Sequence, residues 1–247
     1  MDCVREAAKT APRTTTAVGG RVRRGRPVVT FTLIGICVVS FLLQLATGGR
    51  WTVDFQFWPG IGLHEPWRFL SAAFLHSTSF LPHILFNMYA LYITGQFLEP
   101  VLGRARFITL CLVSAVGASV GVVLLTSPTL TLGGWSWGPA VVGASGMVFG
   151  LFGAMVPVLR RMGANAAQVI GLIAINGIIG FVVPGIAWQA HAGGLVTGLV
   201  LGWGFSHAPR NRQKLVAVLL PAAVVLVLVG VTLARYAAAP LGLSFWL

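Results

Sequence analysis

The stretch Gly143-Ala144-Ser145-Gly146-Met147-Val148-Phe149-Gly150 decides the fold and the chemistry that we expect of this chain. It places one serine hydroxyl between small residues, at the beginning of an apolar segment that continues to Val156. Small residues at such positions let membrane helices pack closely. The motif alone therefore fits helix packing as well as catalysis, and the remainder of the chain has to distinguish the two.

Composition identifies an integral membrane protein. Of 247 residues, 56% are hydrophobic and 9% are charged, and the mean hydropathy is +0.86. A soluble domain has about 25% charged residues. In so apolar a chain, the net charge of +12 indicates membrane orientation and argues against nucleic-acid binding. The isolated Cys3, Cys37 and Cys111 predict neither a disulfide framework nor a zinc site.

The hydropathy pattern predicts an all-α, polytopic helical bundle. Residues 1–26 mix Thr, Ala, Gly and Arg without apolar periodicity, which predicts a disordered basic tail on the cytoplasmic side. Seven apolar runs follow, each near the ~20 residues that a helix needs to cross a ~30 Å hydrocarbon core. They lie at about 28–48, 83–98, 107–126, 142–159, 168–184, 187–206 and 215–236.

The distribution of Lys and Arg predicts the orientation of this bundle. If every run spans the membrane, fourteen of the 17 basic residues lie on the side of the N-terminal tail. The positive-inside rule then places the N-terminus in the cytoplasm and the C-terminus outside. We therefore expect a multi-pass protein of the plasma membrane.

Two long connections are expected on the outer side. Residues 49–82 are rich in Trp and Phe, which suits the membrane interface. Residues 127–141 contain Pro and Gly and cannot form a regular helix. Irregular backbone at membrane depth requires protein or a water-filled cavity around it, and such a cavity would supply water for hydrolysis.

Polar residues at the beginnings of three runs form a candidate catalytic site. His83 and Asn87 share one face of the second run, Ser145 begins the fourth, and His191 begins the sixth. Even-numbered runs begin at the outer face, so all four residues are expected at similar depth. A lone membrane histidine can be a hydrogen-bonded packing residue, but this combination favours function.

Glycines explain how these residues could meet. The fourth run carries Gly146, Gly150 and Gly153 at helical spacing, and the sixth carries Gly194, Gly198 and Gly202. Two such smooth faces let helix backbones approach closely. This packing would bring the short serine hydroxyl within the ~2.6–3.2 Å reach of an imidazole.

The chemistry expected of the set is acyl transfer. Ser145 would be the nucleophile and His191 its general base, with Phe149 supporting the imidazole by ring packing. No membrane-embedded Asp or Glu is expected to complete a triad. The oxyanion would be stabilised by the beginning of the fourth helix, and by His83 and Asn87.

These motifs closely resemble those of rhomboid intramembrane serine proteases. The matching segments are Trp67-Arg68, His83-Ile84-Leu85-Phe86-Asn87, Gly143-Ala144-Ser145-Gly146, and Ala190-His191 followed by Gly194 and Gly198. The resemblance covers about residues 50–206. One departure is Phe149, where many members have Tyr.

The resemblance implies a six-helix catalytic core over residues 27–206, to which 207–247 add a cytoplasmic loop and a seventh transmembrane helix. It implies that Ser145 and His191 are catalytic, that the Ser145 N–H, His83 and Asn87 form the oxyanion site, and that nearby residues support it. The supporting residues are Gly143, Gly146, Phe149, Gly194 and Gly198. Transmembrane proteins in the lipid bilayer would be the substrates, and neither metal nor organic cofactor is implied.

Two other functions remain open. A catalytically silent rhomboid-like protein could bind transmembrane clients, but retention of Ser145 and His191 counts against it. A small-solute transporter explains the seven runs, but not the glycine-flanked serine.

Overall fold

The computed structural model describes residues 26–131 and 134–239, most of which are helical. The expected tail, residues 1–26, lies outside the described residues except for Arg26. The long helices are α2 (Val28–Ala46), α5 (Pro82–Leu102), α6 (Arg104–Leu125), α7 (Ser145–Arg161), α8 (Ala167–Val182), α9 (Trp188–His207) and α10 (Gln213–Ala237). Each coincides with one of the seven predicted runs, and the fold is the helical bundle that the sequence predicts.

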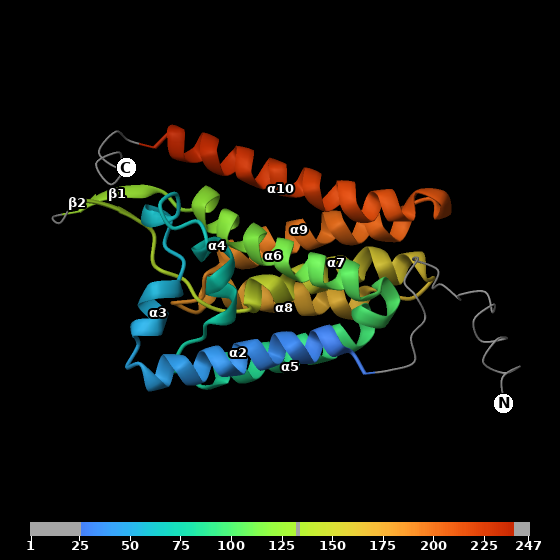
Figure 1. The fold of residues 1–247 in the computed structure, drawn as a ribbon, viewed down its shortest axis with the longest axis horizontal. Coiled ribbons are helices and arrows are strands. Elements are labelled where there is room, and N and C mark those ends of the chain that lie inside the picture. The colour runs from blue at the N-terminus through green and yellow to red at the C-terminus, as the bar shows by residue number, and fades with distance from the viewer. Residues whose placement is uncertain (1–25, 132–133, 240–247) are drawn as a thin grey trace, which may run out of the picture.

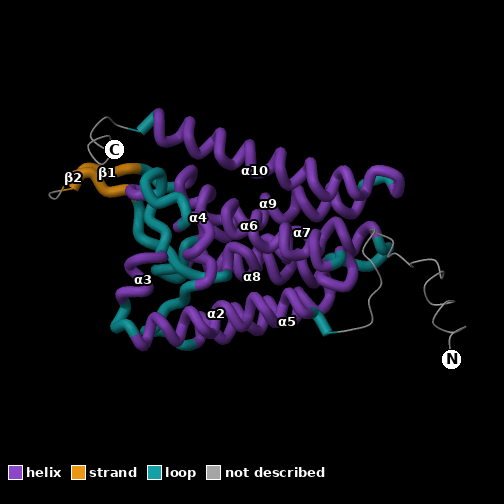
Figure 2. Tube along the Cα trace, in the orientation of Figure 1, coloured by secondary structure: helices purple, strands orange, loops and turns teal. Residues whose placement is uncertain are grey.

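The helices form an elongated bundle with α10 along one side and α2 and α5 along the other (Figure 1). Helices α6 to α9 lie between them, and α6 and α7 are buried over most of their length. The strands and the longest loops gather at one end of the bundle (Figure 2). That end is also where α7 and α9 begin, so loops surround the candidate site.

The outer surface of the bundle is apolar. Large side chains such as Phe86 and Leu226 are 71% and 72% exposed, which water would not favour but lipid would. By length and composition, three segments of the described chain could cross a membrane: α2, α6, and residues 210–237, which include α10. Helix α8 is apolar but shorter.

Helix α5 extends four residues beyond the predicted end, through Glu99 and Pro100. The helix can continue past Glu99 because the carboxylate of this residue is hydrogen-bonded to α2. The carboxylate accepts hydrogen bonds from the backbone N–H groups of Val29 (3.0 Å) and Thr30 (2.9 Å), and from the Thr30 hydroxyl (2.8 Å). Because the first N–H groups of a helix have no partner within it, Glu99 satisfies the beginning of α2. These bonds let a carboxylate that is 3% exposed stay within the helical segment.

The glycine faces of α7 and α9 lie against each other. A Cβ atom added at Gly194 would lie 1.9 Å from the carbonyl oxygen of Gly146, and one added at Gly198 would lie 1.9 Å from that of Gly150. Helix α6 is equally close, because a Cβ at Gly146 would lie 2.2 Å from the Cβ of Ala118. No side chain fits between these backbones, so glycine sets the distance between α7 and α9.

The connection between α2 and α5 contains four short helices and is held by a buried arginine. The helices are α3 (Arg50–Phe55), η1 (Pro59–Ile61), α4 (Arg68–Ser71) and η2 (Ala72–Phe74). Arg68 donates to the carbonyl oxygens of Val53 (2.6 Å) and Gln56 (2.8 Å), and pairs with Glu65. These bonds tie the connection into one folded unit.

A β-hairpin, which the sequence did not predict, occupies part of residues 127–141. Strand β1 (Pro128–Thr131) pairs antiparallel with β2 (Gly134–Trp137). After it, Val141 exchanges two backbone hydrogen bonds with Phe57, at 2.7 and 3.1 Å. The absence of a regular helix was predicted correctly, and this pairing fixes the chain just before α7.

We expect Gly198→Ala to lower the free energy of unfolding by about 1–3 kcal/mol or more, because the new methyl group would overlap the Gly150 carbonyl. Unfolding in mixed detergent micelles measures the change. Gly230→Ala in α10 is the control, since nothing lies within 4 Å of the added Cβ. Equal effects of the two substitutions would contradict the packing described for α7 and α9.

Candidate active site

Ser145 is the first residue of α7, and the backbone before it is fixed in an unusual conformation. Gly143 has φ +132°, a backbone conformation that residues with a side chain rarely adopt. Its N–H donates to the carbonyl oxygen of Ala72 at 2.9 Å. Glycine at 143 therefore lets the loop turn into α7 with Ser145 facing the neighbouring helices.

The side chains of Ser145 and His191 are hydrogen-bonded, with 3.0 Å between Oγ and Nε2. The residues begin α7 and α9, the two helices that the glycine contact holds together. If the hydroxyl donates, Nε2 is the acceptor and the imidazole proton resides on Nδ1. This is the protonation state in which an imidazole can accept the serine proton.

The ring of Phe149 holds the His191 imidazole in place. The two rings are stacked, with centroids 4.2 Å apart and planes inclined by 10°. The buried Nδ1 of His191 has no hydrogen-bond partner among the described residues. The orientation of this imidazole therefore depends on ring stacking and on Ser145, without a carboxylate behind it.

His83 faces the same small space as Ser145. A Cβ atom added at Gly143 would lie 2.8 Å from His83 Nε2 and 3.7 Å from Ser145 Oγ. The backbone N–H of Ser77 donates to His83 Nδ1 at 3.2 Å. Because Nδ1 is an acceptor, a neutral His83 carries its proton on Nε2. A donor thus points into the space that Gly143 leaves open beside Ser145.

Asn87 lies one turn further along α5 and is buried, with 7% of its surface exposed. Its Nδ2 donates to the carbonyl oxygen of His83 at 2.8 Å. No hydrogen bond among the described residues joins it to Ser145 or His191. The structure therefore brings Ser145, His191 and His83 together and places Asn87 directly behind His83, with a second N–H still available.

Gln44 is a part of this site that the sequence reasoning missed. It lies in α2 with 1% of its surface exposed, and its side-chain amide binds both backbone groups of His76. Nε2 donates to the His76 carbonyl and Oε1 accepts from the His76 N–H, each at 2.9 Å. Since Ser77 follows and binds His83, Gln44 fixes the loop that determines the His83 tautomer. The available signal was the one side-chain amide within the run 28–48.

His76 itself is fully buried beside His83, with ring centroids 5.3 Å apart. Burial, and secondarily the electrostatic interaction with His83, lower the pKa of His76 to about 3. The ring is therefore neutral at physiological pH. No contact among the described residues assigns this ring a chemical role.

Metal ligands do not cluster in the part of the chain that the structure describes. Nowhere in it do three or more His, Cys, Asp or Glu side chains gather to hold a metal ion. Cys37 and Cys111 are free thiols buried within the bundle. The groups that do meet are a hydroxyl, imidazoles and backbone N–H groups, which suit acyl transfer.

Comparisons with known proteins agree on one family. The family model of the Rhomboid domain matches residues 63–208. RHOMBOID-like protein 1 of Arabidopsis thaliana is 35% identical over 154 residues, which are 60% of this chain and 36% of that protein. Rhomboid protease GlpG of Yersinia pestis (strain Pestoides F) is 31% identical over 198 residues, 75% of this chain and 66% of the relative. GlpG of Yersinia pseudotuberculosis serotype O:3 (strain YPIII) gives the same values. The chain thus spans about one third of the plant protein and just under two thirds of the bacterial ones.

We expect Gln44→Leu to raise the hydrogen-exchange rates of the His76 and Ser77 amides at least about tenfold, because the loop loses both of its bonds to α2. Hydrogen–deuterium exchange followed by mass spectrometry measures this. Gln168→Leu removes an exposed glutamine from α8 and is the matched control. Unchanged exchange in Gln44→Leu would show that the two hydrogen bonds of the Gln44 amide do not hold the loop.

Proposed function

The chain belongs to the rhomboid family, and from this premise we propose that it is an intramembrane serine endopeptidase. Its substrates are other membrane proteins, cut in or near their transmembrane segments. The observation that carries the proposal is the 3.0 Å hydrogen bond between Ser145 Oγ and His191 Nε2, within a family that includes proteases. No cofactor takes part.

In the proposed mechanism, Ser145 Oγ attacks the carbonyl carbon of the scissile peptide bond while its proton moves to His191 Nε2. The carbonyl π electrons move to the oxygen, which becomes an oxyanion. When the intermediate collapses, the C–N bond breaks and His191 returns the proton to the leaving amine. A water molecule then attacks the ester, with His191 again accepting a proton, and Ser145 is released.

The oxyanion is stabilised by the Ser145 N–H and His83 Nε2, which already face the site, and by Asn87 after a rotation of its side chain. The Ser145 N–H is free for this role because it belongs to the first turn of α7. His83 Nε2 faces the space beside Gly143, and Asn87 donates from behind it once its amide turns toward the oxyanion. Loss of one donor of this kind typically costs on the order of 10²–10³ in rate.

Substrate reaches the site by passing α8. Gly180 is the one buried residue of this helix, whereas α7 beside it is buried over most of its length. A Cβ at Gly180 would lie 3.5 Å from His191 Nδ1, so α8 closes the site on the histidine side. A loosely packed helix at this position can move aside with a small loss of contacts.

The proposed orientation puts the N-terminus in the cytoplasm and the C-terminus outside, in the plasma membrane. Its support is the separation of charge along the bundle. The basic residues at one end of the bundle lie where α6 and α10 begin, where α7 ends, and in the short helix 210–212: Arg104, Arg160, Arg161, Arg210, Arg212 and Lys214. The hairpin and the beginnings of α7 and α9 lie at the other end (Figure 1). The active site then opens toward the outer face.

The alternative, a silent rhomboid-like protein that binds transmembrane clients, needs neither a nucleophile nor a base. The paired side chains of Ser145 and His191 favour the protease. Catalysis is therefore the property to test.

Purified protein reconstituted with a single-span membrane substrate should cleave it, and Ser145→Ala or His191→Ala should each lower kcat at least 10³-fold. Gel analysis of the products measures cleavage. Ser206→Ala is the matched control, because Ser206 also contacts a histidine, His207, at 3.0 Å, but at the other end of α9. Equal cleavage by wild type and both dyad variants would refute the proposed function.

Asn87→Ala should lower kcat about 10²–10³-fold and change KM little, since its proposed bond forms mainly in the transition state. Steady-state kinetics in proteoliposomes separate the two constants. Asn176→Ala is the control, because Asn176 makes the same type of bond, to the Leu172 carbonyl at 2.9 Å, but on α8. A raised KM with unchanged kcat would remove Asn87 from the oxyanion site.

A further inference from the structure

A cavity lies at the end of the bundle opposite the proposed active site. It has a volume of about 980 Å³ and is bounded by the end of α7, the end of α9 and the beginning of α10. We call it the α7/α9/α10 groove; its lining includes Val156, Arg160, Leu199, Trp203, His207, Arg212, Leu215 and Leu219. The proposed proteolysis does not use it.

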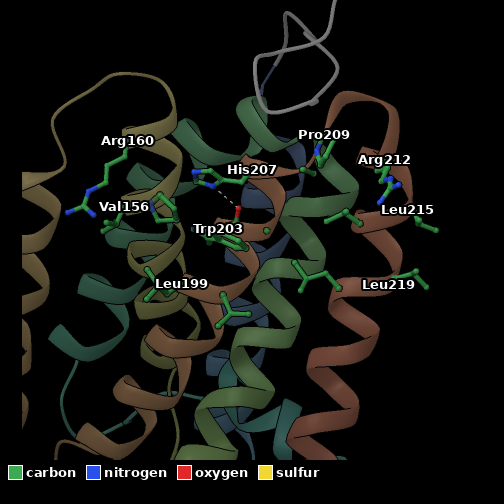
Figure 3. A pocket seen from close by; sticks show the side chains of 15 residues that line it. Val156, Arg160, Leu199, Trp203, His207, Pro209, Arg212, Leu215 and Leu219 are labelled. Carbon is green, nitrogen blue, oxygen red and sulfur yellow. Dashed lines mark hydrogen bonds between the residues drawn. The ribbon is translucent and has the colours of Figure 1, made fainter.

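The groove is polar near the ends of the helices and apolar further along them. Arg160, His207 and Arg212 lie at the same level, and Leu199 and Leu219 lie deeper along the helices (Figure 3). Trp203 stacks on His207, with ring centroids 5.2 Å apart, and remains 60% exposed. A ligand that fits must carry a polar head and an apolar chain.

The charge at the mouth of the groove is positive and has no anionic partner in the described protein. Arg160 and Arg212 are exposed and make no ion pair there. The three described carboxylates, Asp54, Glu65 and Glu99, pair with other arginines. No Asp or Glu follows Glu99 in the sequence. The head of the ligand is therefore an anion supplied from outside the chain.

We propose that the α7/α9/α10 groove binds one anionic phospholipid, with its head at the level of Arg160, His207 and Arg212. One acyl chain lies along Leu199, Leu215 and Leu219, and the exposed indole of Trp203 lies at the level of the lipid head. Basic pockets between membrane helices recognise anionic lipid heads by this charge complementarity. The chain's own N-terminal tail is excluded as the occupant, because its seven basic residues would be repelled.

The lipid also has a structural consequence for α10. In this helix only Pro221 and Thr232 are buried, so the protein alone covers little of it. A chain in the groove adds contacts between the beginning of α10 and the ends of α7 and α9. Binding to the native state raises its stability by mass action.

The test uses delipidated full-length protein in neutral detergent, titrated with dioleoyl phosphatidylglycerol or dioleoyl phosphatidylcholine. Native mass spectrometry counts bound lipid, and thermal unfolding reports stabilisation. We expect one phosphatidylglycerol to bind in preference to phosphatidylcholine. The variant Arg160→Gln/Arg212→Gln should bind it about 30-fold more weakly, from roughly one basic-residue contribution for each arginine.

The matched control is Arg161→Gln/Arg210→Gln, which removes the same charge from neighbouring exposed positions outside the groove lining. It should retain preferential binding. Equal weakening in both double variants, or equal binding of the two lipids to wild type, would overturn the proposal. Full competition by soluble glycerol phosphate would also overturn it, since the head would then bind without its chain.

Discussion

The close contact between α7 and α9 is the constraint on which the rest of the structure depends. Added Cβ atoms at Gly194 and Gly198 would lie 1.9 Å from carbonyl oxygens of α7, so the helix backbones touch. In lipid no hydrophobic force drives helices together, and packing of small residues supplies the contact. The distance between the two backbones in turn places a serine and a histidine, each at the beginning of its helix, within hydrogen-bond reach.

Polar groups in this bundle are placed by other polar groups, because unsatisfied ones are costly in a membrane. Glu99 satisfies the beginning of α2, and Gln44 in α2 satisfies the backbone of His76. The following residue, Ser77, sets the tautomer of His83. The donor beside Ser145 is therefore fixed by a series of contacts that begins in a different helix. Helix α2 contributes to the site without containing any proposed catalytic residue.

The sequence predicted the long helices because apolar runs of spanning length leave few alternatives. It also predicted that Ser145, His191 and His83 lie at similar depth. Successive membrane helices run in opposite directions, so every second helix begins on the same side. The end of α5 was predicted too early, because a glutamate normally marks the end of an apolar membrane segment. Its hydrogen-bond partner Thr30 lies 69 residues away and could not be recognised from the local sequence. Gln44 was missed for the same reason. The hairpin and the α7/α9/α10 groove depend on segments distant in sequence, which local patterns do not identify.

We propose that this packing makes Ser145 a nucleophile with His191 as its base. Covalent labelling by a fluorophosphonate tests that claim most directly, because the reagent reports an activated serine without requiring a known substrate. Peptide mapping of the labelled wild type should find the phosphonyl group on Ser145, and His191→Ala should abolish labelling. Labelling of a different serine, or of Ser145 at an unchanged rate without the imidazole, would contradict the account.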